Sequence, residues 1–197
     1  MKGPALLTAL LFSTCINAQV LKLHFLYGSK PAKGYKATES KHFGGIKGGH
    51  VNIELNGKVL DFLPGNCPIF PENKNPTGGF RLNGSIYWDT ASTRWATIVI
   101  PISAEKEKQL ETLFNELSQK TPYDYAVFGM RCAAATYDVL SEAGLVKKLS
   151  NSNNIIRNFY PKLLRKRMMK WAEKNNYTII SHEGKPSRKW ESDKGIF

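Results

Sequence analysis

Hydrophobic and polar residues alternate most regularly between residues 50 and 63, where the sequence reads HVNIELNGKVLDFL. The alternation predicts two strands, at 50–55 and 58–63, joined by Asn56-Gly57. An Asn-Gly pair readily supplies the positive φ angles of a type I′ turn, so these strands are expected to form a hairpin.

Other parts of the first half carry weaker strand and loop signals. Short alternating or apolar runs predict further strands at 20–27, 85–89, 94–102 and, near the end of the chain, 177–180. The apolar sequence WATIVIPI within 94–102 is typical of a central strand. Proline and glycine recur across 64–84, which is therefore expected to be a loop.

Hydrophobic residues recur at helical spacing in the second half of the chain. Ser103 is expected to cap a helix over 104–119 with a core-facing apolar stripe. A second helix is expected to open at Cys132 and to end at Ala143-Gly144. The remaining pieces are helices at 154–160 and 161–174 and a polar tail at 184–197.

The hairpin also groups its polar residues. In the register set by a two-residue turn, Asn52 lies opposite Asp61 and His50 lies opposite Leu63. One face then carries His50, Asn52, Glu54 and Asp61, and the other carries apolar residues for the core. A histidine beside a carboxylate has the geometry of an oriented general base.

Cys132 is the candidate nucleophile, because the partial positive charge at a helix N-terminus favours a thiolate. Two other roles remain open for it. Most cysteines are small buried hydrophobic residues, and Cys67, in the Pro-rich loop, is a possible disulfide partner in an oxidising compartment. His24 and His42 are expected to be structural or solvated.

Length and the N-terminus place the chain in a broad class. With 197 residues, 42% of them hydrophobic, it is expected to form one domain over 19–197, with a C-terminal helical extension at about 151–197. Residues 1–18 resemble a secretory signal peptide, so a periplasmic or secreted protein is expected. Lipid attachment at Cys15 is the less favoured alternative, because Phe12-Ser13-Thr14 precede it where small residues are preferred.

Charge indicates the kind of partner. The formal net charge of +12 favours an anionic partner, such as a cell-wall peptide or a lipid. No nucleic-acid-binding motif accompanies that charge, and no cofactor or metal is expected. The helix at 161–174 is basic around an apolar stripe. Packing of the stripe on the domain itself is favoured over peripheral contact with an anionic membrane.

The stretches GGHVNIELNGKVLDF and YDYAVFGMRCAAATYDVLSEAGL resemble the NlpC/P60 cysteine-peptidase superfamily, in the circularly permuted branch where the histidine strand precedes the cysteine helix. The resemblance implies an α+β, permuted papain-like fold with an antiparallel sheet packed against the nucleophile helix and extra C-terminal helices. It makes Cys132 the nucleophile, His50 the general base and Asp61 the residue that orients the imidazole. Arg131 and Ala133 depart from the usual pattern, in which Asp and Ser flank the cysteine.

The resemblance implies an exported cysteine hydrolase that cleaves an amide bond through a thioester, with cell-wall (peptidoglycan) peptides as the leading substrate. Two alternatives stay open. Permuted relatives include enzymes that act on acyl lipids, so a lipid acyl hydrolase or acyltransferase is the first. The second is a non-catalytic binding module on the same scaffold.

Overall fold

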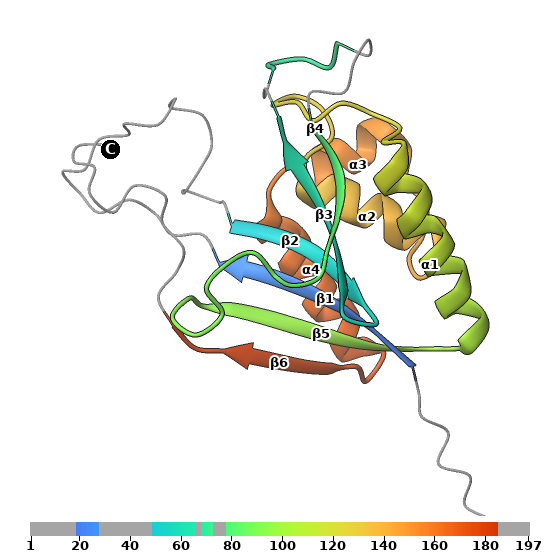
Figure 1. Ribbon diagram of the computed structural model, residues 1–197. Helices are drawn as coiled ribbons and strands as arrows, with labels where there is room; N and C mark the ends of the chain where they lie inside the picture. Colours follow the sequence, from blue (N-terminus) through green and yellow to red (C-terminus); the bar gives the residue numbers. More distant parts are fainter. Residues whose placement is uncertain (1–18, 28–48, 66–67, 73–77, 185–197) are drawn as a thin grey trace, which may run out of the picture.

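The computed structural model describes residues 19–27, 49–65, 68–72 and 78–184. Its strands form one antiparallel sheet in the order β4-β3-β2-β1-β5-β6 (Figure 1). The strands are β1 (Gln19–Tyr27), β2 (Gly49–Leu55), β3 (Lys58–Pro64), β4 (Gly78–Asn83), β5 (Trp95–Ile102) and β6 (Thr178–His182). The helices are α1 (Ala104–Gln119), α2 (Cys132–Glu142), α3 (Asn151–Arg157) and α4 (Pro161–Lys174). The expected α+β class is therefore confirmed.

The two faces of the sheet differ in character because side chains alternate along each strand. One face is apolar and packs against helices: α2 contacts β2 and β3, α1 contacts β4, and α4 contacts β1, β2, β5 and β6. Its buried residues include Phe25, Val51 and Ile98. The opposite face carries buried polar residues, among them His24 and Asn52. The functional candidates of the hairpin belong to this polar face.

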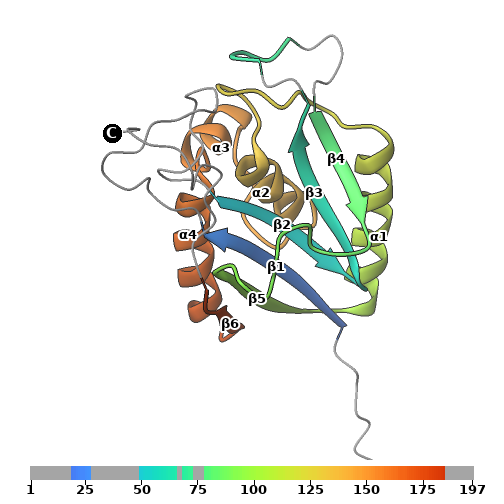
Figure 2. The same cartoon turned by 60° about the vertical axis from the view of Figure 1, so that its left-hand side comes forward.

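The hairpin forms at the predicted turn, but its ladder ends before the expected pairs of Asn52 with Asp61 and of His50 with Leu63. Asn56 and Gly57 have φ angles of 50° and 74°, and the strands pair at Leu55 with Lys58, Glu54 with Val59 and Ile53 with Leu60. Beyond these pairs β2 and β3 separate, and α2 is seen in the opening between them (Figure 2). The divergence matters for the site, because it lets the start of a helix approach the start of β2.

The helices largely match their predicted positions. Ser103 caps α1 by accepting a hydrogen bond from the Lys106 N–H at 3.1 Å. Helix α3 begins and ends three residues earlier than expected. Helix α4 begins at Pro161 and buries Leu164, Met168 and Ala172, so its apolar stripe packs on its own domain. Within the described ranges no helix combines the length and apolarity needed to cross a membrane.

Two predictions around β4 are wrong. The expected loop at 64–84 contains β4, and the expected strand at 85–89 is an irregular segment with bends. Glycine at position 78 favours a loop in the local sequence. In the structure, the absence of a side chain there allows β4 to pair with β3, because a Cβ would lie 2.3 Å from the Leu63 carbonyl oxygen. The stretch at 85–89 resembled a strand because of its aromatic residues, but Trp88 instead packs with Leu26 and Trp95.

Other expectations lie outside the described residues or stay untested. The signal peptide, Cys15, His42, Cys67 and the tail from 185 onward fall outside the described ranges. That residues 19–197 form a single domain stays a prediction.

Candidate active site

His50 and Asp61 lie on β2 and β3 at the point where the two strands begin to separate. The His50 Nε2 atom is 2.8 Å from the Asp61 Oδ1 atom. Both residues are buried, with 6% of His50 and none of Asp61 exposed to solvent. A carboxylate removed from water in this way holds the imidazole in one orientation.

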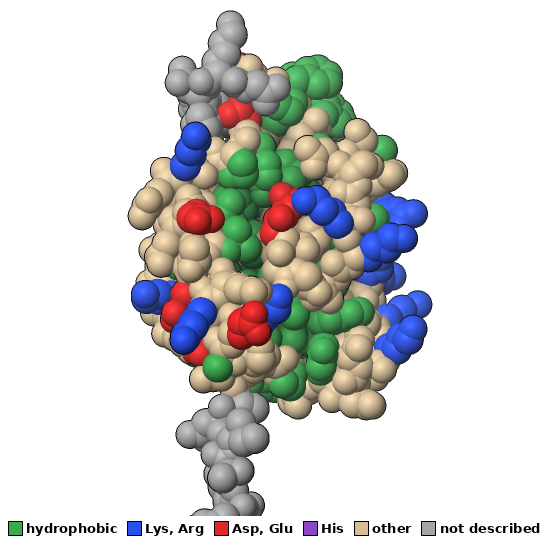
Figure 3. Space-filling view, turned by 90° about the vertical axis from the view of Figure 1, so that its right-hand side faces the viewer, with side chains coloured by type: hydrophobic (Ala, Val, Ile, Leu, Met, Phe, Trp, Pro, Cys, Tyr) green, Lys and Arg blue, Asp and Glu red, His purple; other side chains and the backbone are tan. Residues whose placement is uncertain are grey.

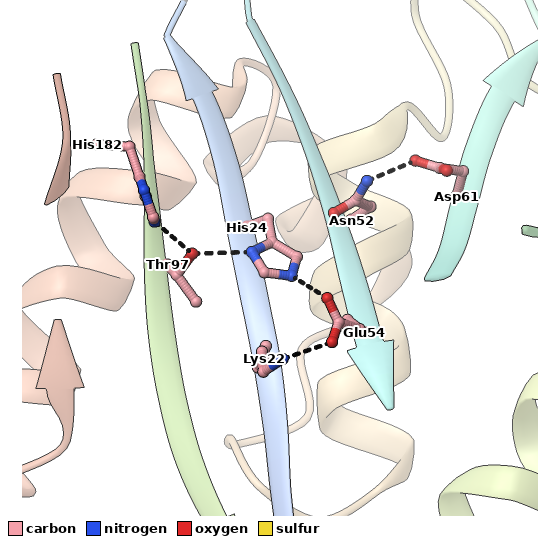
Figure 4. Close-up of polar contacts among 7 residues, drawn as sticks. All are labelled: Lys22, His24, Asn52, Glu54, Asp61, Thr97 and His182. Carbon is pink, nitrogen blue, oxygen red and sulfur yellow. Dashed lines mark hydrogen bonds and ion pairs between the residues drawn. The ribbon is translucent and has the colours of Figure 1, made fainter. Parts of the chain in front are cut away.

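Two asparagine amides hold Asp61 in turn. Asn52 Nδ2 donates to Asp61 Oδ1 at 3.0 Å, and Asn83 Nδ2 donates to Asp61 Oδ2 at 2.9 Å. Both carboxylate oxygens of Asp61 therefore have hydrogen-bond partners. Those of Oδ1 come from β2, and that of Oδ2 comes from the end of β4. Figure 4 shows Asn52 and Asp61 pointing toward each other from neighbouring strands.

Cys132 is the first residue of α2 and carries a free thiol. It is only 5% exposed. Its sulfur is hydrogen-bonded to the His50 side chain and to the backbone of Val51, the residue after His50 on β2. Since Nε2 of His50 faces Asp61, the ring nitrogen left for the sulfur is Nδ1. The structure thus brings the three residues Cys132, His50 and Asp61 together in one row.

The charges of this row favour a thiolate beside an imidazolium. Burial by itself raises the pKa of the Cys132 thiol, but His50 and then Arg131 outweigh it, so the pKa is lowered. Burial by itself lowers the pKa of His50, but Cys132 and Asp61 outweigh it and raise the pKa to about 9. At neutral pH the pair is therefore poised for nucleophilic attack.

Arg131 lies directly before Cys132 and adds positive charge near the sulfur. Its guanidinium carbon is 4.7 Å from the ring centroid of Phe159 and 5.5 Å from that of Tyr160. Stacking on these rings fixes the side chain next to the site. The Arg131 guanidinium is therefore held beside the site by the two rings rather than extended into solvent.

Two aromatic residues from the turn region after β4 surround His50. The ring of Tyr87 meets the imidazole edge-on, with centroids 5.1 Å apart, and that of Trp88 lies 6.1 Å away. Tyr87 is 55% exposed, whereas Trp88 is buried. Although more than half of the Tyr87 residue is exposed, its hydroxyl is largely surrounded by protein; this desolvation raises the hydroxyl pKa first, and the negative charges of Cys132 and Asp61 raise it further. Tyr87 therefore stays protonated and covers the imidazole from solvent.

A second polar cluster occupies the same sheet face, one strand further on (Figure 4). His24 on β1 contacts Thr97 Oγ1 through Nδ1 at 2.9 Å and Glu54 Oε2 through Nε2 at 3.0 Å. Glu54 also binds Lys22 Nζ at 2.6 Å. Burial lowers the pKa of His24 despite the nearby carboxylate. His24 is thus a structural residue, as expected, and Glu54 belongs to this cluster rather than to the cysteine site.

Sequence reasoning missed three neighbours of the site: Asn83, Tyr87 and Trp88. Asn83 lies where a loop was expected, and the pairing of Val59 with Asn83 between β3 and β4 is what brings its amide to Asp61. Only recognition of β4 as a strand in that register would have found it. Tyr87 and Trp88 follow no periodic pattern that points to His50.

In the part of the chain that the structure describes, no group of three or more His, Cys, Asp or Glu side chains is arranged to hold a metal ion.

Comparisons with known proteins give a distant likeness of fold. No model of a protein family matches the sequence, and no curated protein matches it. Among solved structures, the chain is similar to the crystal structure of a type VI secretion system effector, TseH. The identity is 12% and the TM-score 0.41, over 85% of this chain and 99% of that one.

Replacing Asn83 by alanine is expected to lower turnover about tenfold, since it removes one hydrogen bond to a buried carboxylate. Asp61 would then hold His50 less firmly while Cys132 stays in place. The expected signature is a lower kcat at unchanged KM, with a changed pH profile of thiol alkylation. Asn115→Ala, an exposed asparagine on α1, is the matched control. Loss of thermal stability without any change in the pH profile would mark Asn83 as merely structural.

Proposed function

We propose that this chain is a thiol hydrolase that cleaves an amide bond through a covalent thioester. Cys132 is the nucleophile, His50 the general base and acid, and Asp61 the residue that orients the imidazole. The single observation that carries the proposal is the placement of the His50 ring. Its Nε2 atom contacts Asp61, and its other ring nitrogen, Nδ1, is left for Cys132. A buried histidine bridging a thiol and a carboxylate is the arrangement that activates a cysteine.

The reaction follows from this geometry in two steps. The Cys132 thiolate attacks the amide carbonyl, the C–N bond breaks, and the His50 imidazolium gives its proton to the leaving amine. Water then attacks the thioester while His50 takes a proton from it, releasing a carboxylic acid and the thiolate. The backbone N–H of Cys132, at the free start of α2, is a donor for the oxyanion that forms in both steps.

The order and packing of the elements support membership of the permuted NlpC/P60 branch. The strand that carries His50 precedes the helix that carries Cys132, and that helix packs against β2 and β3 of an antiparallel sheet. Arg131 and Ala133 remain departures from the usual pattern of the superfamily.

We propose cell-wall (peptidoglycan) peptides as the substrate and the periplasm or the exterior as the compartment. A net charge of +12 favours peptides rich in carboxylates, and Arg131 beside the nucleophile suits a substrate carboxylate. The signal-like residues 1–18 support export.

The direct test is to incubate the protein with purified cell-wall fragments and to identify the products by mass. Cleavage of one amide bond by the wild-type chain, absent with Cys132→Ala, is the expected result. Intact fragments, together with a Cys132 that resists alkylation at neutral pH, would instead favour a non-catalytic binding module.

A second candidate function is an acyl hydrolase or acyltransferase that acts on lipids. It is favoured by exposed apolar side chains close to the site, among them Phe128, which is 52% exposed and lies four residues before Cys132. Release of fatty acid from lipid vesicles, with no cleavage of cell-wall fragments, would select this function over the first.

A further inference from the structure

Large apolar side chains are exposed where two segments meet beside the start of α2. The Val127 N–H donates to the Pro68 carbonyl at 2.9 Å, and the Phe128 N–H donates to the Ile69 carbonyl at 2.8 Å. This pairing presents Ile69, Phe70 and Phe128 to solvent, with 58%, 66% and 52% of each residue exposed. The rings of Phe70 and Phe128 contact each other, with centroids 5.6 Å apart.

The row of aromatic rings reaches Phe159, and an exposed apolar side chain lies within four residues of Phe159 in the sequence on each of α3 and α4. The Phe128 ring lies 6.2 Å from the ring of Phe159, and Phe159 belongs to the short segment that connects α3 to α4. Ile156, on α3, is 71% exposed, and Leu163, in the first turn of α4, is 40% exposed. We call this surface the apolar rim; it consists of Ile69, Phe70, Phe128, Ile156, Phe159 and Leu163. Figure 3 shows hydrophobic side chains gathered at the same end of the molecule as the segment 68–72.

Basic residues adjoin the apolar rim. Lysines recur at every fourth position of α4, which sets like charges on neighbouring turns and weakens the helix. Together with one arginine of α3 they form the basic flank, which consists of Arg157, Lys162, Lys166, Lys170 and Lys174. The single carboxylate of α3 and α4 is Glu173, in the last turn of α4. Lys and Arg side chains also gather along one edge of the face in Figure 3.

We propose that the apolar rim and the basic flank dock this protein on an anionic lipid bilayer. Lysines and arginines are attracted by anionic head groups, and aromatic side chains prefer the boundary between head groups and acyl chains. A soluble polyanion would neutralise the lysines but would leave the exposed phenylalanines in water. A bilayer satisfies both parts of the surface at once.

Docking would also set the direction of the candidate active site. Arg131 stacks on Phe159 of the apolar rim and immediately precedes Cys132. The rim therefore borders the nucleophile, and the docked protein would turn Cys132 toward the lipid surface. The docking itself requires no catalysis, so it stands or falls separately from the proposed hydrolase.

Co-sedimentation of the full chain with vesicles tests the proposal. Vesicles that contain phosphatidylglycerol are expected to bind the protein, and vesicles of phosphatidylcholine alone to bind it at least about tenfold more weakly. Phe70→Ser with Phe128→Ser is expected to weaken binding about tenfold or more at any salt concentration. Lys166→Gln with Lys170→Gln is expected to weaken it roughly fivefold for each lysine at low salt, and less at high salt.

Matched controls lie elsewhere on the molecule. Ile180→Ser removes an exposed apolar residue of β6, and Lys108→Gln an exposed lysine of α1; both are expected to bind as the wild type does. Equal binding to neutral and anionic vesicles would overturn the proposal. So would unchanged binding of the phenylalanine variant to the anionic vesicles. Cys132→Ala is expected to bind vesicles fully, which separates docking from hydrolysis.

Discussion

Cys132→Ala is expected to abolish hydrolysis, lowering turnover by roughly 10⁴-fold to 10⁶-fold. Alanine keeps the small buried volume at the start of α2 but offers no atom that can form the thioester. The measurement is the release of product from cell-wall peptide fragments, followed by mass, with circular dichroism to show that the fold is retained.

The matched control for this variant is Cys67→Ala, which removes the other cysteine of the expected mature chain. It should leave turnover unchanged if Cys132 alone is the nucleophile. Substantial product from the Cys132→Ala protein would refute the assignment, whatever the effect of Cys67→Ala. A covalent acyl adduct trapped on the Cys132 peptide of the wild-type chain would support it directly.

His50→Ala is expected to lower turnover about 10³-fold and to change how Cys132 ionises. In the wild-type protein His50 lowers the pKa of Cys132, so iodoacetamide should alkylate this thiol well below the pH at which ordinary cysteines react. Without the imidazole, burial would raise the thiol pKa, and only the charge of Arg131 and the backbone hydrogen bond from Val51 would oppose it. Alkylation near neutral pH should then fall about tenfold or more and recover at higher pH.

The pH dependence of the wild-type protein has a defined sign. On the acid side, activity should fall when the Cys132 thiolate takes up a proton, below the usual thiol range because the pKa is lowered. On the alkaline side, it should fall as the pH passes about 9, where the His50 imidazolium loses the proton that the leaving amine needs. Alkylation, which needs no acid, should keep its high rate above that pH.

Alkylation is read by mass spectrometry at the peptide that contains Cys132, so that other cysteines do not contribute. His24→Ala, a buried histidine of the second polar cluster, is the control for loss of an imidazole from the same sheet face. If alkylation of Cys132 had the same pH midpoint in the wild-type and His50→Ala proteins, His50 would not be its activating base.

The parts of the site that sequence could predict are those set by local chemistry. The Asn56-Gly57 turn fixes the hairpin register, and that register puts His50 and Asp61 on the same face of the sheet. Ser103 and the apolar spacing after it define α1 with correct ends. Cys132 was assigned to the first turn of a helix, and it is the first residue of α2.

The rest depended on contacts between distant segments. β4 was missed because Gly78 and Gly79 favour a loop locally, while the contacts that require glycine come from Leu63 and Thr121. Asn83 was missed with that strand. Tyr87 reaches His50 from an irregular turn, and no periodic pattern predicts the position of such a side chain. The approach of Cys132 to His50 was expected from the family resemblance, not from any local signal.

The divergence of β2 and β3 has a consequence for the order in which reactivity develops. The hairpin is local in the chain and can form early, whereas the sulfur meets His50 only after α2 has packed into the opening between the strands. Until then Cys132 is an ordinary thiol, mostly protonated at neutral pH. In the unfolded chain Cys132 is therefore unreactive, and completion of the sheet–helix packing is the step that lowers its pKa.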